Sequence, residues 1–220
     1  FNFLYRSEST QPLDRKWAVA LLKDVAEAIE YLHGVSISHR DLKSPNVVLR
    51  VRGGGNVEAV VIDFGLAKTV GSSNSNAFTT PGGPVGSLRW MAYELVDDEI
   101  VTFPRDRCDI FAFGMIVLEV LSNEVPWSYL KTDQKVNTAL MKRRTPEKSI
   151  PAGAHPDLIN LMRRCWLEEP LHRPTSREVV GALERILQEF GGDPRDNLIY
   201  NQKTANQLDP RIQELAFPKL

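Results

Sequence analysis

The stretch from His39 to Asn46, HRDLKSPN, concentrates a carboxylate, a lysine and an amide within eight residues. Asp63, Phe64 and Gly65 follow, with Asp63 seventeen residues after Asn46. Two β-branched runs, 47–51 and 57–62, lie between these stretches and are separated by three glycines. Such runs predict a β-hairpin with a flexible turn. Whatever fold the chain adopts must therefore place chemically active groups on both sides of a short hairpin.

These polar residues suit the transfer of a phosphoryl group. That reaction needs a divalent metal to neutralise the phosphates, a residue that orients the attacking hydroxyl, and a cation near the migrating group. Asp41 is the candidate that accepts or orients the hydroxyl proton, and Lys43 could contact the moving phosphate. Asn46 and Asp63 offer the hard oxygen ligands that Mg²⁺ prefers, enough for one metal ion or two.

Helices are predicted for most of the remaining chain. Apolar residues recur every three or four positions from Asp14 to Gly34, and Asp14 is placed to cap that helix. The segment 105–121 is apolar on nearly all sides, which predicts a helix buried at the centre of the domain. Further helices are expected over 132–144, 157–167 and 176–190.

A long loop and a tail interrupt this helical pattern. Residues 63–94 are rich in Gly, Ser, Thr, Asn and Pro and contain few periodic apolar residues, which predicts a long loop of the kind that is usually functional or mobile. Residues 191–220 are polar and aperiodic. We expect residues 1–190 to form a single domain and 191–220 to form a polar tail or linker.

Composition limits the partners and the compartment. With 25% charged residues and a formal net charge of -1, the chain offers no electrostatic case for nucleic acid or an anionic membrane. The longest apolar run, 110–118, is too short to span a bilayer. Cys108 and Cys165 lie in apolar or aromatic runs, as reduced core cysteines of an intracellular protein do, so we expect a cytoplasmic location. The spacing of His33, His155 and His172 predicts no metal site.

Taken together, five signatures resemble the eukaryotic protein kinases, and among them the tyrosine-kinase-like group of serine/threonine kinases. They are His39-Arg40-Asp41 with Lys43 and Asn46, Asp63-Phe64-Gly65, 86–94, 109–114, and the pairs Cys165-Trp166 and Arg173-Pro174. The resemblance covers about residues 1–190. It implies an α+β protein-kinase-like fold, of which this chain holds the mainly helical C-terminal lobe, with short β-hairpins near the catalytic loop and without the N-terminal lobe.

The resemblance assigns roles in catalysis and cofactor binding. It makes Asp41 the catalytic base and Lys43 a contact of the transferred phosphate. Asn46 and Asp63 would bind Mg²⁺, or Mn²⁺ in its place, together with ATP. Val48 would form part of the floor beneath adenine.

It also assigns structural roles. His39 and Phe64 would stack in a hydrophobic spine. Asp109 would hold the backbone of the catalytic loop, and Glu94 would pair with Arg173.

A regulatory role is implied for Arg40, which would meet a phosphorylated residue of the activation loop. The best candidates are Thr79 and Thr80, and weaker ones are Ser72, Ser73 and Ser75. Ser87 stands where the family usually has threonine and keeps the hydroxyl that helps to align base and substrate.

Two departures from the family pattern bear on function. The family's Ala-Pro-Glu is Ala92-Tyr93-Glu94 here, which keeps the glutamate and loses a rigid turn, at little expected cost. The glycine-rich loop, the ATP-gripping lysine and its partner glutamate are not found, and residues 1–5 resemble the segment just after the hinge. Half a cleft binds nucleotide poorly, so we expect little or no kinase activity from the isolated chain.

In the parent protein, by which we mean a longer protein that carries the small lobe, the implied reaction is transfer of the γ-phosphoryl of Mg-ATP to a protein serine or threonine. Lys43 followed by Ser-Pro-Asn favours serine/threonine over tyrosine specificity, although the group includes dual-specificity members. The alternative is a non-catalytic pseudokinase or a truncated interaction module. The sequence does not specify substrate, pathway or oligomeric state.

Overall fold

The computed structural model describes residues 14–51, 56–69, 86–97, 99 and 103–195. The α-helices in this part of the chain are α1 (Arg15–Gly34), α2 (Asp106–Ser122), α3 (Asp133–Met141), α4 (Pro156–Cys165) and α5 (Ser176–Glu189). The strands are β1 (Ile37–Ser38), β2 (Val47–Val51), β3 (Val57–Val61) and β4 (Lys68–Thr69). A mainly helical lobe with small antiparallel sheets confirms the predicted fold class.

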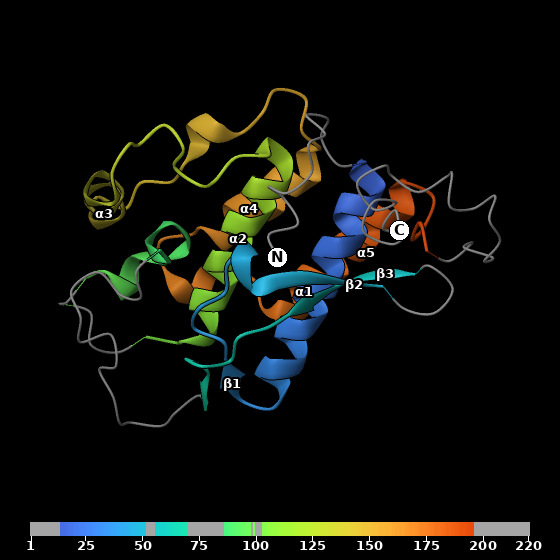
Figure 1. Ribbon diagram of the computed structural model, residues 1–220, viewed down its shortest axis with the longest axis horizontal. Helices are drawn as coiled ribbons and strands as arrows, with labels where there is room; N and C mark the ends of the chain where they lie inside the picture. The colour runs from blue at the N-terminus through green and yellow to red at the C-terminus, as the bar shows by residue number, and fades with distance from the viewer. Residues whose placement is uncertain (1–13, 52–55, 70–85, 98, 100–102, 196–220) are drawn as a thin grey trace, which may run out of the picture.

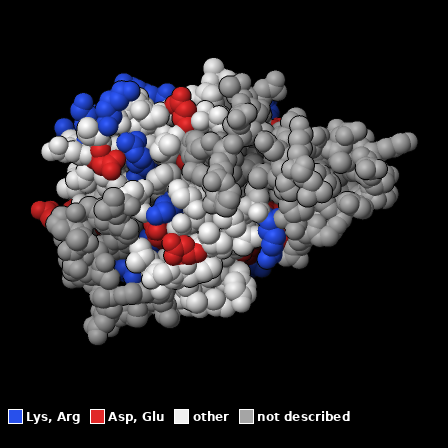
Figure 2. Space-filling view, viewed as in Figure 1, with Lys and Arg blue, Asp and Glu red and all other residues white. Residues whose placement is uncertain are grey.

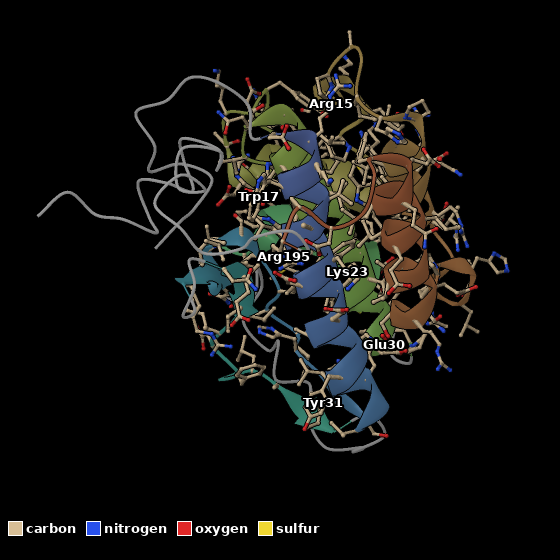
Figure 3. The ribbon with its side chains drawn as sticks, turned by 90° about the vertical axis from the view of Figure 1, so that its right-hand side faces the viewer. Arg15, Trp17, Lys23, Glu30, Tyr31 and Arg195 are labelled. Atoms are coloured by element: carbon tan, nitrogen blue, oxygen red, sulfur yellow. The ribbon has the colours of Figure 1, made fainter. Side chains whose placement is uncertain are left out.

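Helix α1 begins where the sequence predicted. The Asp14 carboxylate accepts hydrogen bonds from the backbone amides of Lys16 and Trp17, and so satisfies donors that a helix start leaves free. The buried face of α1 packs against α5 and β3. The chain just beyond α5 also returns to α1, because Arg195 Nη1 donates to Asp24 Oδ2 at 2.7 Å (Figure 3). The boundary proposed after residue 190 therefore stays a prediction.

Helix α2 forms the centre of the lobe. Its residues from Cys108 to Glu119 are all buried, which explains the absence of a polar side in its sequence. Figure 1 shows α2 in the middle of the molecule, with α1 and α5 on one side and α3 at the opposite edge. Within the described residues, no helix is both long and apolar enough to cross a bilayer.

The predicted hairpin is present. Strand β2 pairs antiparallel with β3, and the register runs from Val47 opposite Val61 to Val51 opposite Val57. A second antiparallel pair, Ile37 with Thr69 and Ser38 with Lys68, was not predicted. Two-residue strands are too short to show an alternating pattern, so the pairing of β1 with β4 has no signal in the sequence.

Helix α3 ends earlier than expected, at Met141 rather than at 144. Arg143 adopts a left-handed backbone conformation with φ of 52°. The amide of Arg144 then bonds back to the carbonyl of Ala139 at 3.0 Å, which closes the last turn. A left-handed residue stops an α-helix, and an arginine in that position gives no warning in the sequence.

Gly114, in the middle of α2, lies against the ring of Trp166. A Cβ atom built at Gly114 would stand 2.7 Å from Trp166 Nε1 and 2.8 Å from Cys165 Cβ. We expect Gly114→Ala to lower the free energy of unfolding by ~1–3 kcal/mol through overpacking, measured by urea denaturation. Gly181→Ala in α5 is the matched control: its new methyl would meet only the flexible end of Arg185, at 3.7 Å, so higher helix propensity should stabilise it by up to ~1 kcal/mol. Equal effects of the two substitutions would contradict the packing argument.

Candidate active site

The loop from His39 to Asn46 is anchored on the buried start of α2. Asp109, which is only 1% exposed, accepts the backbone amides of His39 and Arg40 on its two carboxylate oxygens, both at 2.8 Å. His33 Nε2 lies 3.0 Å from Asp109 Oδ2. Arg40 has a left-handed φ of 69°, a conformation that costs energy unless its surroundings hold it. The Asp109 carboxylate provides that support, so the shape of the loop depends on α2.

Asp41 lies at the centre of a compact polar cluster. Lys43 Nζ donates to Asp41 Oδ2 at 2.8 Å and to Ser87 Oγ at 2.7 Å. Asn46 Nδ2 donates to the Asp41 carbonyl at 2.8 Å and to Asp41 Oδ2 at 3.2 Å. These contacts restrict the rotamer of the Asp41 carboxylate. The structure thus brings together four residues, the first and last of which, Asp41 and Ser87, lie 46 positions apart in the sequence.

Asp63 follows the β2–β3 hairpin, whose end lies beside the loop from His39 to Asn46. The Ile62 amide donates to the Asn46 carbonyl at 2.8 Å, and His39 Nε2 lies 3.1 Å from the Ile62 carbonyl. Asp63 itself is exposed, with a left-handed φ of 65°. The rings of His39 and Phe64 are in contact, with centroids 5.2 Å apart. Phe64 remains 49% exposed.

The donor set at this end suits a hard divalent cation. Both hydrogen bonds given above for Asn46 use the amide nitrogen, so neither consumes the amide oxygen as a ligand. The Asp63 carboxylate is accessible and bonds only the nearby Gly65 amide, at 3.3 Å, among the contacts of the described residues. An amide and a carboxylate oxygen are ligands that Mg²⁺ accepts. Val48, the residue expected under adenine, is half-buried in β2 opposite Val60.

The segment after the long loop is clamped by a buried ion pair. Arg173 donates through Nη1 to Glu94 Oε1 at 2.6 Å and through Nη2 to Glu94 Oε2 at 2.8 Å. Both side chains are almost completely buried. Tyr93, which replaces the family's proline, is 1% exposed and packs edge-on against Phe111, with ring centroids 4.9 Å apart. A packed aromatic ring therefore stands at the position where the family has proline.

Glu119 is a site residue that sequence reasoning missed. This buried glutamate of α2 accepts a hydrogen bond from Ser44 Oγ at 2.8 Å and from Trp90 Nε1 at 2.6 Å. It therefore joins the catalytic-loop candidate to the 3-10 helix Leu88–Trp90, which follows Ser87. The sequence signal that could have revealed Glu119 is a single carboxylate in an otherwise apolar run. A charge buried in such a run requires polar partners.

The two cysteines fit the expected core role. Both are buried, and burial raises the pKa of the Cys165 thiol to about 12. Burial also raises the pKa of Cys108, whose Sγ donates to Glu94 Oε1 at 3.2 Å. Neither thiol has the character of a nucleophile.

Of the residues predicted to be regulatory, the structure describes only Arg40 and Ser87. Thr79, Thr80, Ser72, Ser73 and Ser75 lie outside the described residues. Ser87 is buried beside Lys43, and Arg40 is 9% exposed. A phosphate contact of Arg40 consequently stays a prediction.

The chain is similar to known protein kinases over most of its length. The profile of the family described as "Protein tyrosine and serine/threonine kinase" matches residues 2–183. From Arabidopsis thaliana, the serine/threonine-protein kinase STY17 is 32% identical over 197 residues, which is 89% of this chain and 31% of that protein. The serine/threonine-protein kinase CTR1 is 29% identical over 190 residues, 86% of this chain and 22% of its own length.

A third relative has tyrosine as well as serine and threonine in its name. The Arabidopsis serine/threonine/tyrosine-protein kinase HT1 is 30% identical over 165 residues, 75% of this chain and 39% of its own length. The chain thus spans well under half the length of each of these relatives. The matches confirm the resemblance to serine/threonine kinases of the tyrosine-kinase-like group that the motifs indicated.

Proposed function

Because this chain belongs to the protein tyrosine and serine/threonine kinase family, we propose that it forms the larger lobe of a kinase that transfers the γ-phosphoryl of Mg-ATP to a protein serine or threonine. The observation that carries this proposal is the joint hydrogen bonding of Asp41, Lys43, Asn46 and Ser87. We would not expect a site without catalytic function to retain this hydrogen-bonded cluster.

Each side chain has a task in the proposed reaction. The Asp41 carboxylate orients the substrate hydroxyl and receives its proton, and Lys43 stands beside it as the cation for the migrating phosphoryl group. Ser87 holds Lys43 from the substrate side of the site. Asn46 and Asp63 would hold Mg²⁺, which neutralises charge on the phosphates.

The lobe described above supplies only part of a nucleotide site. Neither the family's glycine-rich phosphate loop nor its ATP-gripping lysine is found in these 220 residues. ATP therefore depends on a small lobe that the parent protein would provide, and the isolated chain should neither bind Mg-ATP measurably in a calorimeter nor phosphorylate protein. Residues 1–190 as the domain, 191–220 as its tail and a cytoplasmic location are part of this proposal.

The test compares the isolated chain with the parent protein, using radiolabelled ATP and a general protein acceptor, followed by phosphoamino-acid analysis. We expect phosphoserine and phosphothreonine from the parent protein and no transfer by the isolated chain. Phosphotyrosine alongside them would extend the specificity. An inactive parent protein, or a full gene without the glycine-rich strand and its lysine, would support a non-catalytic interaction module instead.

A further inference from the structure

One face of the lobe concentrates positive charge in a chain that is nearly neutral. Residues 129–148 contain six lysines and arginines against two acidic residues, whereas the whole chain has a formal net charge of -1. Figure 2 shows Lys and Arg atoms gathering at the upper left, over the region of α3 and the segment that follows it. We define the α3 basic face by its exposed cations, Lys131, Lys135, Lys142, Arg144 and Lys148.

Within the described part of the chain, these cations form no intramolecular ion pairs. The ion pairs of this region use other arginines: Arg143 with Asp97, Arg163 with Glu147 and Arg89 with Asp133. None of them involves the five cations of the face. Helix-dipole stabilisation would account for Lys142 and Arg144 at the end of α3, but not for Lys131, Lys135 or Lys148.

Two large apolar side chains lie among the cations. Met141 is 47% exposed at the end of α3, and Tyr129 is 41% exposed just before it. Tyr129 lies close enough to Arg144 for the guanidinium to oppose the rise in the tyrosine pKa that burial causes. Lys135 and Thr138 of α3 and its C-cap residue Lys142 are spaced three and four residues apart, which puts them on one outward strip, while Val136, Ala139 and Leu140 are buried. Exposed tyrosine, methionine and arginine side chains are enriched at protein interfaces.

Hydrogen bonds and an ion pair of Arg89 link the candidate active site to the start of α3. Arg89, two residues after Ser87, donates to the carbonyls of Pro126 at 2.9 Å and Trp127 at 3.1 Å. Its other nitrogen lies 3.4 Å from Asp133 at the start of α3. Ser87 in turn bonds Lys43, which bonds Asp41. A protein held on the α3 basic face is thus positioned relative to the proposed base.

We propose that the α3 basic face docks an acidic segment of the protein substrate, one rich in Asp and Glu and carrying an apolar side chain for Met141 and Tyr129. This deepens the proposed function and rests on it. A protein segment fits better than a nucleic acid or a membrane, because Met141 and Tyr129 need an apolar side chain to cover them and a phosphate backbone does not supply one.

The test is a binding measurement, which needs no catalysis. A short fluorescent peptide rich in Asp and Glu with a single leucine is titrated with the 220-residue chain at low salt, and its anisotropy is followed. We expect Lys135→Glu with Lys142→Glu to weaken binding about 10-fold or more, and added salt to weaken binding to the unsubstituted chain. Circular dichroism checks that the exposed substitutions leave the fold intact.

The matched control reverses two exposed arginines of α5, Arg177→Glu with Arg185→Glu, which makes the same change in net charge on a helix that packs against α1. It should change the affinity less than about 2-fold. Met141→Ser should weaken binding of the acidic peptide and leave binding of a peptide without the leucine unchanged. An Asp41→Asn chain should bind as the unsubstituted chain does.

Several outcomes would overturn the inference. They are equal losses in the two double variants, equal binding of a peptide with Gln in place of Glu, and tighter binding of phosphatidylserine vesicles or single-stranded RNA than of the peptide. Each of these results leaves the proposed phosphoryl transfer intact. If the parent protein transfers no phosphoryl group but the peptide still binds, the proposed function fails and the docking inference stands. The chain would then be a module that binds acidic segments.

Discussion

Asp41→Asn in the parent protein is expected to lower kcat for phosphoryl transfer by about 100- to 10,000-fold, the range over which a positioned acid or base contributes. The asparagine keeps the size of the side chain and an acceptor for Lys43 Nζ, which now bonds the carboxylate at 2.8 Å. It cannot take the proton of the substrate hydroxyl. KM for ATP should change little, because Asp41 is proposed to act on the acceptor and not on the nucleotide.

The control for this substitution is Asp157→Asn, an exposed carboxylate in the first turn of α4. It makes the same chemical change away from the polar cluster and should leave kcat unchanged. The measurement is the initial rate at saturating ATP, and thermal unfolding of each variant checks the fold. A kcat for Asp41→Asn within about 3-fold of the unsubstituted enzyme would exclude Asp41 as the base.

Arg173→Ala is expected to lower the free energy of unfolding by ~3–5 kcal/mol, because it leaves the Glu94 carboxylate buried without its partner. That is a large part of the stability of a typical domain. The guanidinium also donates to the carbonyls of Leu167 at 2.8 Å, Arg107 at 3.0 Å and Glu168 at 3.5 Å, so the Glu94 carboxylate and three carbonyls lose this donor together. Urea denaturation followed by tryptophan fluorescence gives the value.

Arg163→Ala is the control, since Arg163 makes a similarly bidentate pair with Glu147 on the exposed surface. Its denaturation midpoint should not move measurably, because water screens and replaces that pair. Replacing both Glu94 and Arg173 with methionine should be less damaging than Arg173→Ala alone, since no uncompensated charge remains. A double variant less stable than the single one would show that other contacts dominate.

Local patterns predicted much of the fold. The cap at Asp14, the apolar period of α1 and the all-round apolar character of α2 depend on neighbours within a few positions, and all three were confirmed. The hairpin of β2 and β3 was equally predictable, because it pairs adjacent runs across a short turn. Family motifs then named the site residues, although their roles remain predictions.

Contacts between distant segments were decided by the tertiary structure alone. The pairing of β1 with β4, the bonds of Glu119 to Ser44 and Trp90, and the ion pair of Arg89 with Asp133 of α3 join residues with no periodic relation in the sequence. Local pattern specifies which side of an element is apolar, but the partners of a buried polar group depend on how several such sides pack together. For this reason the sequence by itself predicted a phosphoryl-transfer loop, whereas only the packed lobe showed what holds that loop in place.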